Sequence, residues 1–215
     1  MCARTPFDHL EVETPDGLLV ATPRLLTDPA LAQPVDWVLV ATKAYDHEAT
    51  AVWLRVLFGE GTQIAILQNG VEHVERFSPY VPAGSLLPVV NNCPAERSGP
   101  GRIRLRRTVA LSVPESAAGQ AFLALFAHTK VVVSAIADFK SEMWRKLCVN
   151  CVIEGTLAAY RSHSADAVNS LHAERLAGRP MEVDARNGAV VRIGKKHSIA
   201  TPLNKAMVAL LKAVE

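Results

Sequence analysis

Short runs of apolar, often β-branched residues recur through the first half of the chain and predict buried strands. These runs cover residues 35–42, 63–67 and 86–90, and each is short for a helix. Apolar residues at helical spacing lie between them and predict helices over residues 46–57 and 71–77. Strand and helix therefore alternate, an order typical of a parallel sheet with right-handed crossover connections.

The segments on either side of this region predict further short strands. Apolar runs around a Pro-Asp-Gly turn at residues 15–17 predict a hairpin over residues 10–14 and 18–21. Beyond Pro94 the pattern predicts a meander, with one helix inserted over residues 117–127. The strands of the meander are expected over residues 101–105, 109–113 and 131–134.

The residues after position 137 show helical spacing. Helices are predicted over residues 138–160 and 181–197. A last helix begins at Pro202, since proline suits the first helical position. The chain therefore divides into an α/β part and an all-α part, with the boundary near residues 135–139.

The composition narrows the classes of function. With 215 residues the chain can bury the core of one larger domain or of two small ones. A balance of 23 Lys and Arg against 21 Asp and Glu is too even for a general nucleic-acid-binding protein. No apolar run approaches the roughly 20 residues of a membrane span, and the N-terminus lacks a signal-peptide pattern. We therefore expect a soluble, cytoplasmic protein that binds neither nucleic acid nor membranes.

The cysteine and histidine positions do not predict a metal site. Four cysteines are too few and too scattered for a disulfide framework, and Cys148 and Cys151 form a C-x-x-C pair in mid-helix. We expect these two to be buried apolar side chains rather than a redox or zinc pair. The seven histidines are dispersed along the chain.

Lys146, Asn150 and Glu154 stand four residues apart in an otherwise apolar helix and form one polar stripe on its surface. A cation beside an amide and a carboxylate in apolar surroundings is costly unless a ligand binds there. Desolvation can also lower the pKa of a lysine toward neutrality, and such a lysine can give up a proton. The alternative interpretation is a helix whose polar edge faces water.

Two further groups lie where parallel strands end, which is where open α/β sheets bind ligands. Lys43 follows the strand at residues 35–42, and Asn69-Gly70 follows the strand at residues 63–67. The glycine lets the backbone approach a ligand closely, and the asparagine amide can bond a ribose or a carbonyl group. Asn-Gly is also a common turn, so this pair alone does not identify a site.

Four sequence blocks, taken together and in order, resemble the ketopantoate reductase family, also called 2-dehydropantoate 2-reductase. The blocks are Ala-Thr-Lys43-Ala, Gln-Asn69-Gly70, Met-Trp-Arg-Lys146-Leu-Cys-Val-Asn150 and Glu182-Val-Asp184-Ala-Arg-Asn187-Gly188. The last block continues into the segment Gly194-Lys-Lys-His197-Ser-Ile-Ala-Thr-Pro202. The resemblance runs through most of the chain and is most specific in the two helical blocks.

The resemblance implies an α/β fold, namely a truncated Rossmann-like parallel sheet followed by an all-α C-terminal domain. The expected boundaries are residues 1–135 for a partial NADP-binding domain and residues 136–215 for the helical substrate domain. The implied activity is NADPH-dependent reduction of 2-dehydropantoate to pantoate in pantothenate biosynthesis. The substrate is then a small-molecule 2-oxo acid held between the two domains. A homodimer is compatible with this interpretation but is not predicted by it.

The resemblance also implies roles for the matched residues. Lys146 would be the proton donor, and Glu182 would be the second catalytic residue, beside the cofactor and the substrate. The implied substrate-binding residues are Asn150, Glu154 and Ser170. The implied cofactor-binding residues are Lys43, Asn69, Ala95 and Glu182.

Elementary chemistry agrees with these roles. Hydride arriving at a carbonyl carbon leaves negative charge on the oxygen, and a protonated amine within about 3 Å stabilises and then neutralises that charge. Asn150, one turn along the same helix face as Lys146, can bond the substrate without adding charge. We expect Glu182 to pair with Lys146 and to hold it in place, although without the motif an ordinary solvated acid is the favoured interpretation.

The chain departs from the family in three places. It has no G-x-G-x-x-G motif, so we expect either that the true start lies upstream or that the first βα unit is lacking. Few residues separate Tyr160 from Asn169, where the family has several turns of helix, so we expect part of the helical domain to be missing. Glu154 replaces a family asparagine, and its carboxylate would repel a substrate carboxylate unless it pairs with Lys146.

These departures leave two alternatives to the family activity. One is a catalytically silent remnant that acts at most as a binding or oligomerisation module. The other is a reductase of a different 2-oxo acid. Loss of a first strand also predicts apolar sheet edges, which would aggregate or be covered by a partner.

Overall fold

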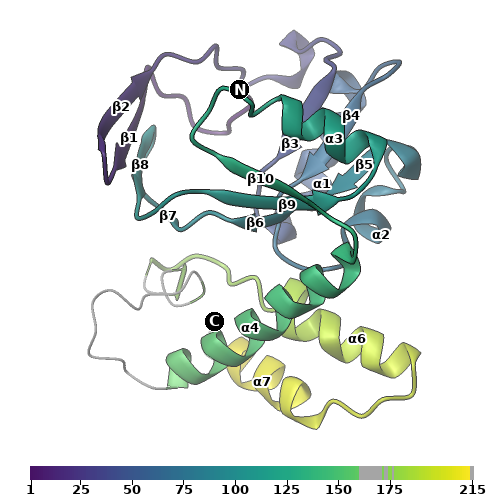
Figure 1. Cartoon of the computed structure of the whole chain (residues 1–215). Helices are drawn as coiled ribbons and strands as arrows, with labels where there is room; N and C mark the ends of the chain where they lie inside the picture. Colours follow the sequence, from purple (N-terminus) through teal and green to yellow (C-terminus); the bar gives the residue numbers. More distant parts are fainter. Residues whose placement is uncertain (160–170, 172–173, 176, 214–215) are drawn as a thin grey trace.

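Strands and helices separate into two halves of the molecule. The computed structural model describes residues 1–159, 171, 174–175 and 177–213, and for residues 152–159 it describes the backbone only. Figure 1 shows the strands gathered in the upper half and α4, α6 and α7 in the lower half. The predicted α/β fold followed by an all-α region is therefore confirmed.

A three-stranded parallel sheet forms the centre of the α/β half. Its strands are β3 (Trp37–Val40), β4 (Gln63–Ile66) and β5 (Leu86–Pro88), in the order β3-β4-β5. The connecting helices α1 (His47–Leu57) and α2 (His73–Phe77) confirm the predicted alternation. Apolar side chains of both helices pack on this sheet, and the fully buried members of the cluster are Leu54, Ile64, Ile66 and Phe77.

A second three-stranded sheet adjoins the first. It contains β6 (Val90–Asn92), β9 (Ala110–Pro114) and β10 (Val132–Ile136), and α3 (Ala117–Ala124) connects the parallel pair β9 and β10. The single strand predicted over residues 86–90 is thus divided into β5 and β6, which belong to different sheets. Pro88 ends β5, and proline has no N–H with which to continue a ladder.

The third sheet corrects the predicted meander. Its order is β2-β1-β8-β7, with β1 (Leu10–Thr14), β2 (Gly17–Ala21), β7 (Ala95–Gly99) and β8 (Arg102–Leu105). The hairpin of β1 and β2 is confirmed, but β8 pairs in parallel with β1 rather than with β9. Arg104 Nε donates to Glu13 Oε2 at 2.9 Å across this pair, so charge matching between distant segments accompanies the pairing.

The helical half is built around α4 (Phe139–Ala159), which leads directly from β10. The helix predicted over residues 181–197 begins later, as the π-helical turn η4 (Asp184–Gly188) followed by α6 (Ala189–Lys196). Helix α7 (Pro202–Ala213) starts at the predicted proline. Its Leu211 packs against Met181, Val183 and Leu171 in a small core. In the described ranges, no helix has both the length and the apolar character to cross a membrane.

Apolar side chains are exposed on two edge strands. Leu39 on β3, an edge strand of the parallel sheet, is 44% exposed. The side chains on β2, an edge strand of the third sheet, are more exposed: 61% for Leu18, 59% for Leu19 and 61% for Val20. Cys148 is also exposed, so the expectation that both C-x-x-C cysteines are buried is wrong.

Gly70 joins the two halves at close range, and replacing it tests this contact. Its φ of +113° is unfavourable for other residues, and an added Cβ would lie 3.0 Å from the carbonyl oxygen of Ala185 in η4. We expect Gly70→Ala to lower the free energy of unfolding by about 1–3 kcal/mol in chemical denaturation. Gly17→Ala is the matched control because Gly17 has a similar φ of +129° and an added Cβ there has no neighbour within 4 Å. Equal stability of the two variants would contradict the close approach.

Candidate active site

A cleft lies where the carboxyl ends of the central strands meet helix α4. Open α/β sheets bind ligands at this position. The strand side consists of the segment after β4 and the junction of β5 with β6, and the helix side consists of one face of α4. The lining residues are Gln68, Asn69, Gly70, Val89, Val90, Met143, Lys146, Leu147 and Asn150. The predicted residues Lys146, Asn150 and Asn69 are therefore brought together.

Lys146 presents a desolvated amine to this cleft. Its Nζ donates a hydrogen bond to the backbone carbonyl oxygen of Asn91 at the end of β6. Burial, and after it the nearby Arg186 guanidinium, lower the pKa of Lys146 to about 8, and the Glu182 carboxylate limits this shift. The amine can therefore change its protonation state near neutral pH, as the polar stripe on the helix predicted.

Glu182 is a buried carboxylate whose partners come from both halves of the molecule. Its Oε1 accepts a hydrogen bond from the backbone N–H of Ala44 at 3.0 Å. Its Oε2 accepts one from Asn69 Nδ2 at 2.9 Å and one from Arg186 Nη2 at 3.1 Å. Lys43 Nζ lies 3.5 Å from the same oxygen. One carboxylate thus holds two of the strand-end residues that the sequence analysis identified.

The expected pairing of Glu182 with Lys146 is wrong for this structure. Among the described residues, the contacts of the Lys146 amine are to Asn91 and those of Glu182 are to other groups. The sequence pattern indicated that Glu182 and Lys146 have opposite charges, but it did not indicate which other donors lie closer to the carboxylate. Backbone and side-chain donors of the strand ends, together with Arg186, reach the carboxylate instead.

Lys43 lies between two acids. Its Nζ contacts Glu174 Oε1 directly and faces Glu182 Oε2, and 41% of its side chain remains exposed. Burial raises the pKa of the Glu174 carboxyl, although the hydrogen bond from Lys43 acts in the opposite direction. The sequence analysis missed Glu174, since no local pattern distinguishes it from a solvated helix acid.

Arg186 was also missed, although its spacing gave a signal. It follows Glu182 by four residues, a separation at which oppositely charged side chains can pair on a helix. Only 1% of its surface is exposed, and burial lowers its pKa to about 10. Glu182 and Arg186 therefore form a buried ion pair at the junction of the two halves.

Three further side chains hold the backbone of the strand ends. Gln68 Nε2 donates to the carbonyl oxygen of Lys43 at 3.1 Å, and Asn91 Nδ2 donates to that of Leu67 at 3.3 Å. His73 Nε2 lies 3.0 Å from the carbonyl oxygen of Gln68, and burial lowers the pKa of His73 to about 4. His73 is thus neutral at physiological pH, and it supports the loop that carries Asn69.

The remaining predicted residues are less closely associated with the cleft. Ala95 is exposed on β7 in the third sheet and does not line the cleft. The side chain of Glu154 lies outside the described part of the chain, and so does the whole of Ser170. The interval between Tyr160 and Asn169, where a missing piece of helix was expected, also lies outside it.

Comparison with known proteins agrees with the motifs. The family "Ketopantoate reductase PanE/ApbA" matches residues 3–118, and "Ketopantoate reductase PanE/ApbA C terminal" matches residues 159–215. A 2-dehydropantoate 2-reductase from Caulobacter vibrioides is 45% identical over 258 aligned positions, which include 99% of this chain and 89% of that protein. Since the aligned stretch exceeds the 215 residues of this chain, the chain is internally shorter than this relative.

Solved structures share the fold. A 2-dehydropantoate 2-reductase from Geobacter metallireducens matches with a TM-score of 0.84 and 21% identity, over 96% of this chain and 86% of that chain. A D-mandelate dehydrogenase, in a ternary structure with NADH and anilino(oxo)acetate, matches with a TM-score of 0.81 and 19% identity. That match covers 95% of this chain and 84% of the other.

The buried position of Glu182 leads to a stability prediction. Glu182→Gln keeps the shape of the side chain but removes the negative charge that faces Arg186 and Lys43. We expect the free energy of unfolding to fall by about 3–5 kcal/mol, as for other broken buried ion pairs. Glu48→Gln is the control because Glu48 is exposed on α1. A change in denaturation midpoint no larger than that of the control would contradict the structural role of Glu182.

Proposed function

The chain belongs to the ketopantoate reductase family, and we propose that it reduces 2-dehydropantoate to pantoate, a step of pantothenate biosynthesis, with NADPH as the reductant. The observation that carries this proposal is the desolvated amine of Lys146 in a cleft at the strand ends. A proton donor with a pKa of about 8 suits the protonation of an alkoxide formed from a ketone. Asn69 and Asn150 line the same cleft and offer neutral hydrogen-bonding groups.

Lys146 serves as the general acid in this proposal. When bound, the nicotinamide cofactor supplies a hydride to the carbonyl carbon of the substrate. Negative charge then grows on the carbonyl oxygen, and the Lys146 ammonium stabilises that charge before giving up its proton. Asn91 accepts a hydrogen bond from Lys146 through its backbone carbonyl oxygen and so aims the amine without adding a negative charge.

The helical half provides the remaining substrate contacts. Asn150 lies one turn beyond Lys146 on α4 and lines the cleft, so its amide can bond the carboxylate or the hydroxyl group of the substrate. Ser170 and Glu154 are proposed as further substrate-binding residues on the basis of the matched motifs. Residues 136–215 then form the substrate domain.

The strand ends fit the nicotinamide end of a dinucleotide. Glu182 holds the amide of Asn69 through Nδ2, and Oδ1 of the same amide is an acceptor that can bind a ligand donor. Lys43 adds a partly exposed cation, and Gly70 presents bare backbone. We propose residues 1–135 as the cofactor domain, with Lys43, Asn69, Ala95 and Glu182 on the cofactor side.

A different 2-oxo acid is the second candidate substrate. The structural neighbour D-mandelate dehydrogenase is described with NADH and anilino(oxo)acetate, which is a 2-oxo acid derivative. The same cleft chemistry serves any 2-oxo acid, because hydride and proton transfer involve only the carbonyl group. Comparison of kcat/KM for 2-dehydropantoate with values for other 2-oxo acids, and of NADPH with NADH, decides between these assignments.

Replacement of Lys146 tests the proposed reaction. Oxidation of NADPH in the presence of 2-dehydropantoate is expected for this polypeptide, and Lys146→Ala should lower kcat by about 10²–10⁴-fold because the general acid is lost. Lys140→Ala is the control, since Lys140 is an exposed lysine on the same helix. Absence of turnover by the unaltered chain would support the catalytically silent alternative instead.

The pKa of Lys146 also predicts the pH dependence. Reduction requires the protonated amine, so kcat/KM should be constant well below pH 8 and should fall about tenfold per pH unit above it. In the reverse direction, oxidation of pantoate requires the neutral amine and should increase over the same range. Measuring kcat/KM against pH for both reduction and oxidation checks that the two rates change in opposite directions. A reduction rate that stays constant to pH 10 would contradict the role of Lys146.

A further inference from the structure

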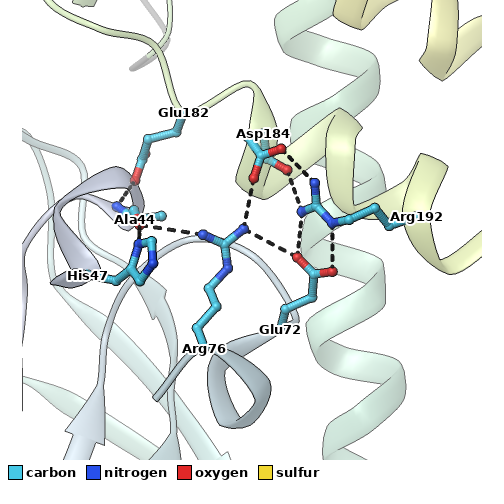
Figure 2. A network of polar contacts seen from close by, with 7 residues as sticks. All are labelled: Ala44, His47, Glu72, Arg76, Glu182, Asp184 and Arg192. Atoms are coloured by element: carbon cyan, nitrogen blue, oxygen red, sulfur yellow. Dashed lines mark hydrogen bonds and ion pairs between the residues drawn. The ribbon is translucent and has the colours of Figure 1, made fainter. Parts of the chain in front are cut away.

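The second acid of the Glu182-Val-Asp184 motif lies outside the cleft, in a ring of charged side chains shown in Figure 2. We call Glu72, Arg76, Asp184 and Arg192 the charged ring. Arg76 Nη2 lies 3.3 Å from Glu72 Oε2 and 3.2 Å from Asp184 Oδ2. Arg192 closes the ring with hydrogen bonds of 2.6 Å to both acids. The ring joins the start of α2 to η4 and α6 and so spans the two halves.

The charged ring reaches the residue that follows Lys43. Arg76 Nη1 donates to the carbonyl oxygen of Ala44 at 3.4 Å, and His47 Nδ1 lies 3.3 Å from the same oxygen. The N–H of Ala44 donates to Glu182 Oε1 at 3.0 Å. The two acids of one motif therefore hold both polar groups of one residue. Glu182 acts directly on the N–H, and Asp184 acts on the carbonyl oxygen through Arg76.

Fixing Ala44 has a consequence for Lys43. The lysine side chain has four rotatable bonds, so the position of its amine depends on the backbone from which it starts. Ala44 is 1% exposed, and with its N–H and carbonyl groups both held, the two peptides that flank it, one of which joins it to Lys43, have little freedom. The Lys43 amine is thereby kept between Glu174 and Glu182 at the edge of the cleft.

We propose that Arg76, held by Asp184 and Glu72, is a positioning residue that fixes the Ala44 peptide and through it aims Lys43. The proposal rests on the proposed function, in which Lys43 lies on the cofactor side. Arg76 and Glu72 contribute most to fixing the Ala44 peptide, because their side chains are the more buried members of the charged ring. They are 16% and 18% exposed, against 62% for Asp184. The planar fork of arginine presents separate nitrogens to these acceptors in a fixed geometry, whereas the three donors of a lysine share one nitrogen on a flexible stem.

Hydrogen exchange at the Ala44 amide tests the positioning without any reaction. Arg76→Gln should raise the exchange rate of this amide by about tenfold, because a charge-assisted contact that holds the loop is lost, and Asp184→Asn should raise it by a smaller factor. Exchange in β4 should not change. Arg55→Gln is the control, since Arg55 is exposed on α1. Unchanged exchange at Ala44, or an equal increase in β4, would overturn the proposal.

A double-mutant cycle with Lys43 tests whether Arg76 acts through the lysine. Arg76→Gln should lower kcat/KM by about tenfold in the unaltered chain and should have little further effect in Lys43→Ala. Arg76→Lys is not expected to restore kcat/KM, because a lysine lacks the planar fork of arginine. The same loss in both backgrounds would show a purely structural role and overturn the proposal. If the unaltered chain does not turn over 2-dehydropantoate, the proposed function fails, and exchange at Ala44 still decides the positioning role.

Discussion

The buried carboxylate of Glu182 is the interaction on which the arrangement of the site depends. A charge removed from water must be compensated by hydrogen bonds and opposite charge, or it costs several kcal/mol. Glu182 obtains this compensation from Ala44 and Asn69 at the strand ends and from Arg186 on its own segment. The helical half and the sheet can therefore satisfy this charge in only a narrow range of relative positions.

The two lysines of the site differ because Glu182 is already engaged. Lys43 contacts acids directly, whereas Lys146 has a neutral carbonyl oxygen as its partner. Desolvation of Lys146 is therefore only partly offset, and its pKa falls to about 8. In the proposed reaction this difference separates the roles, since the less compensated lysine gives up a proton and the paired lysine keeps a fixed place beside the cofactor.

Much of the site could be predicted because its residues occupy positions that local pattern defines. Lys146 and Asn150 share one face of a helix through their four-residue spacing, and Asn69 follows a strand. Arg186 was within reach of the same rule, being four residues after Glu182. Glu174 and Asn91 were not predicted, since their contacts with Lys43 and Lys146 join residues far apart in sequence.

By itself, the sequence determined the helices and central strands, the α/β order, the hairpin and the residue types that face the cleft, because these follow from the period of apolar residues and from turn chemistry. The tertiary structure alone decided that β8 pairs with β1, that one predicted strand serves two sheets, and that Glu182 binds Asn69 and Ala44 instead of Lys146. Strand pairing and ion pairing depend on which distant groups come within a few ångströms of each other. That proximity results from the packing of the whole chain, which no local pattern contains.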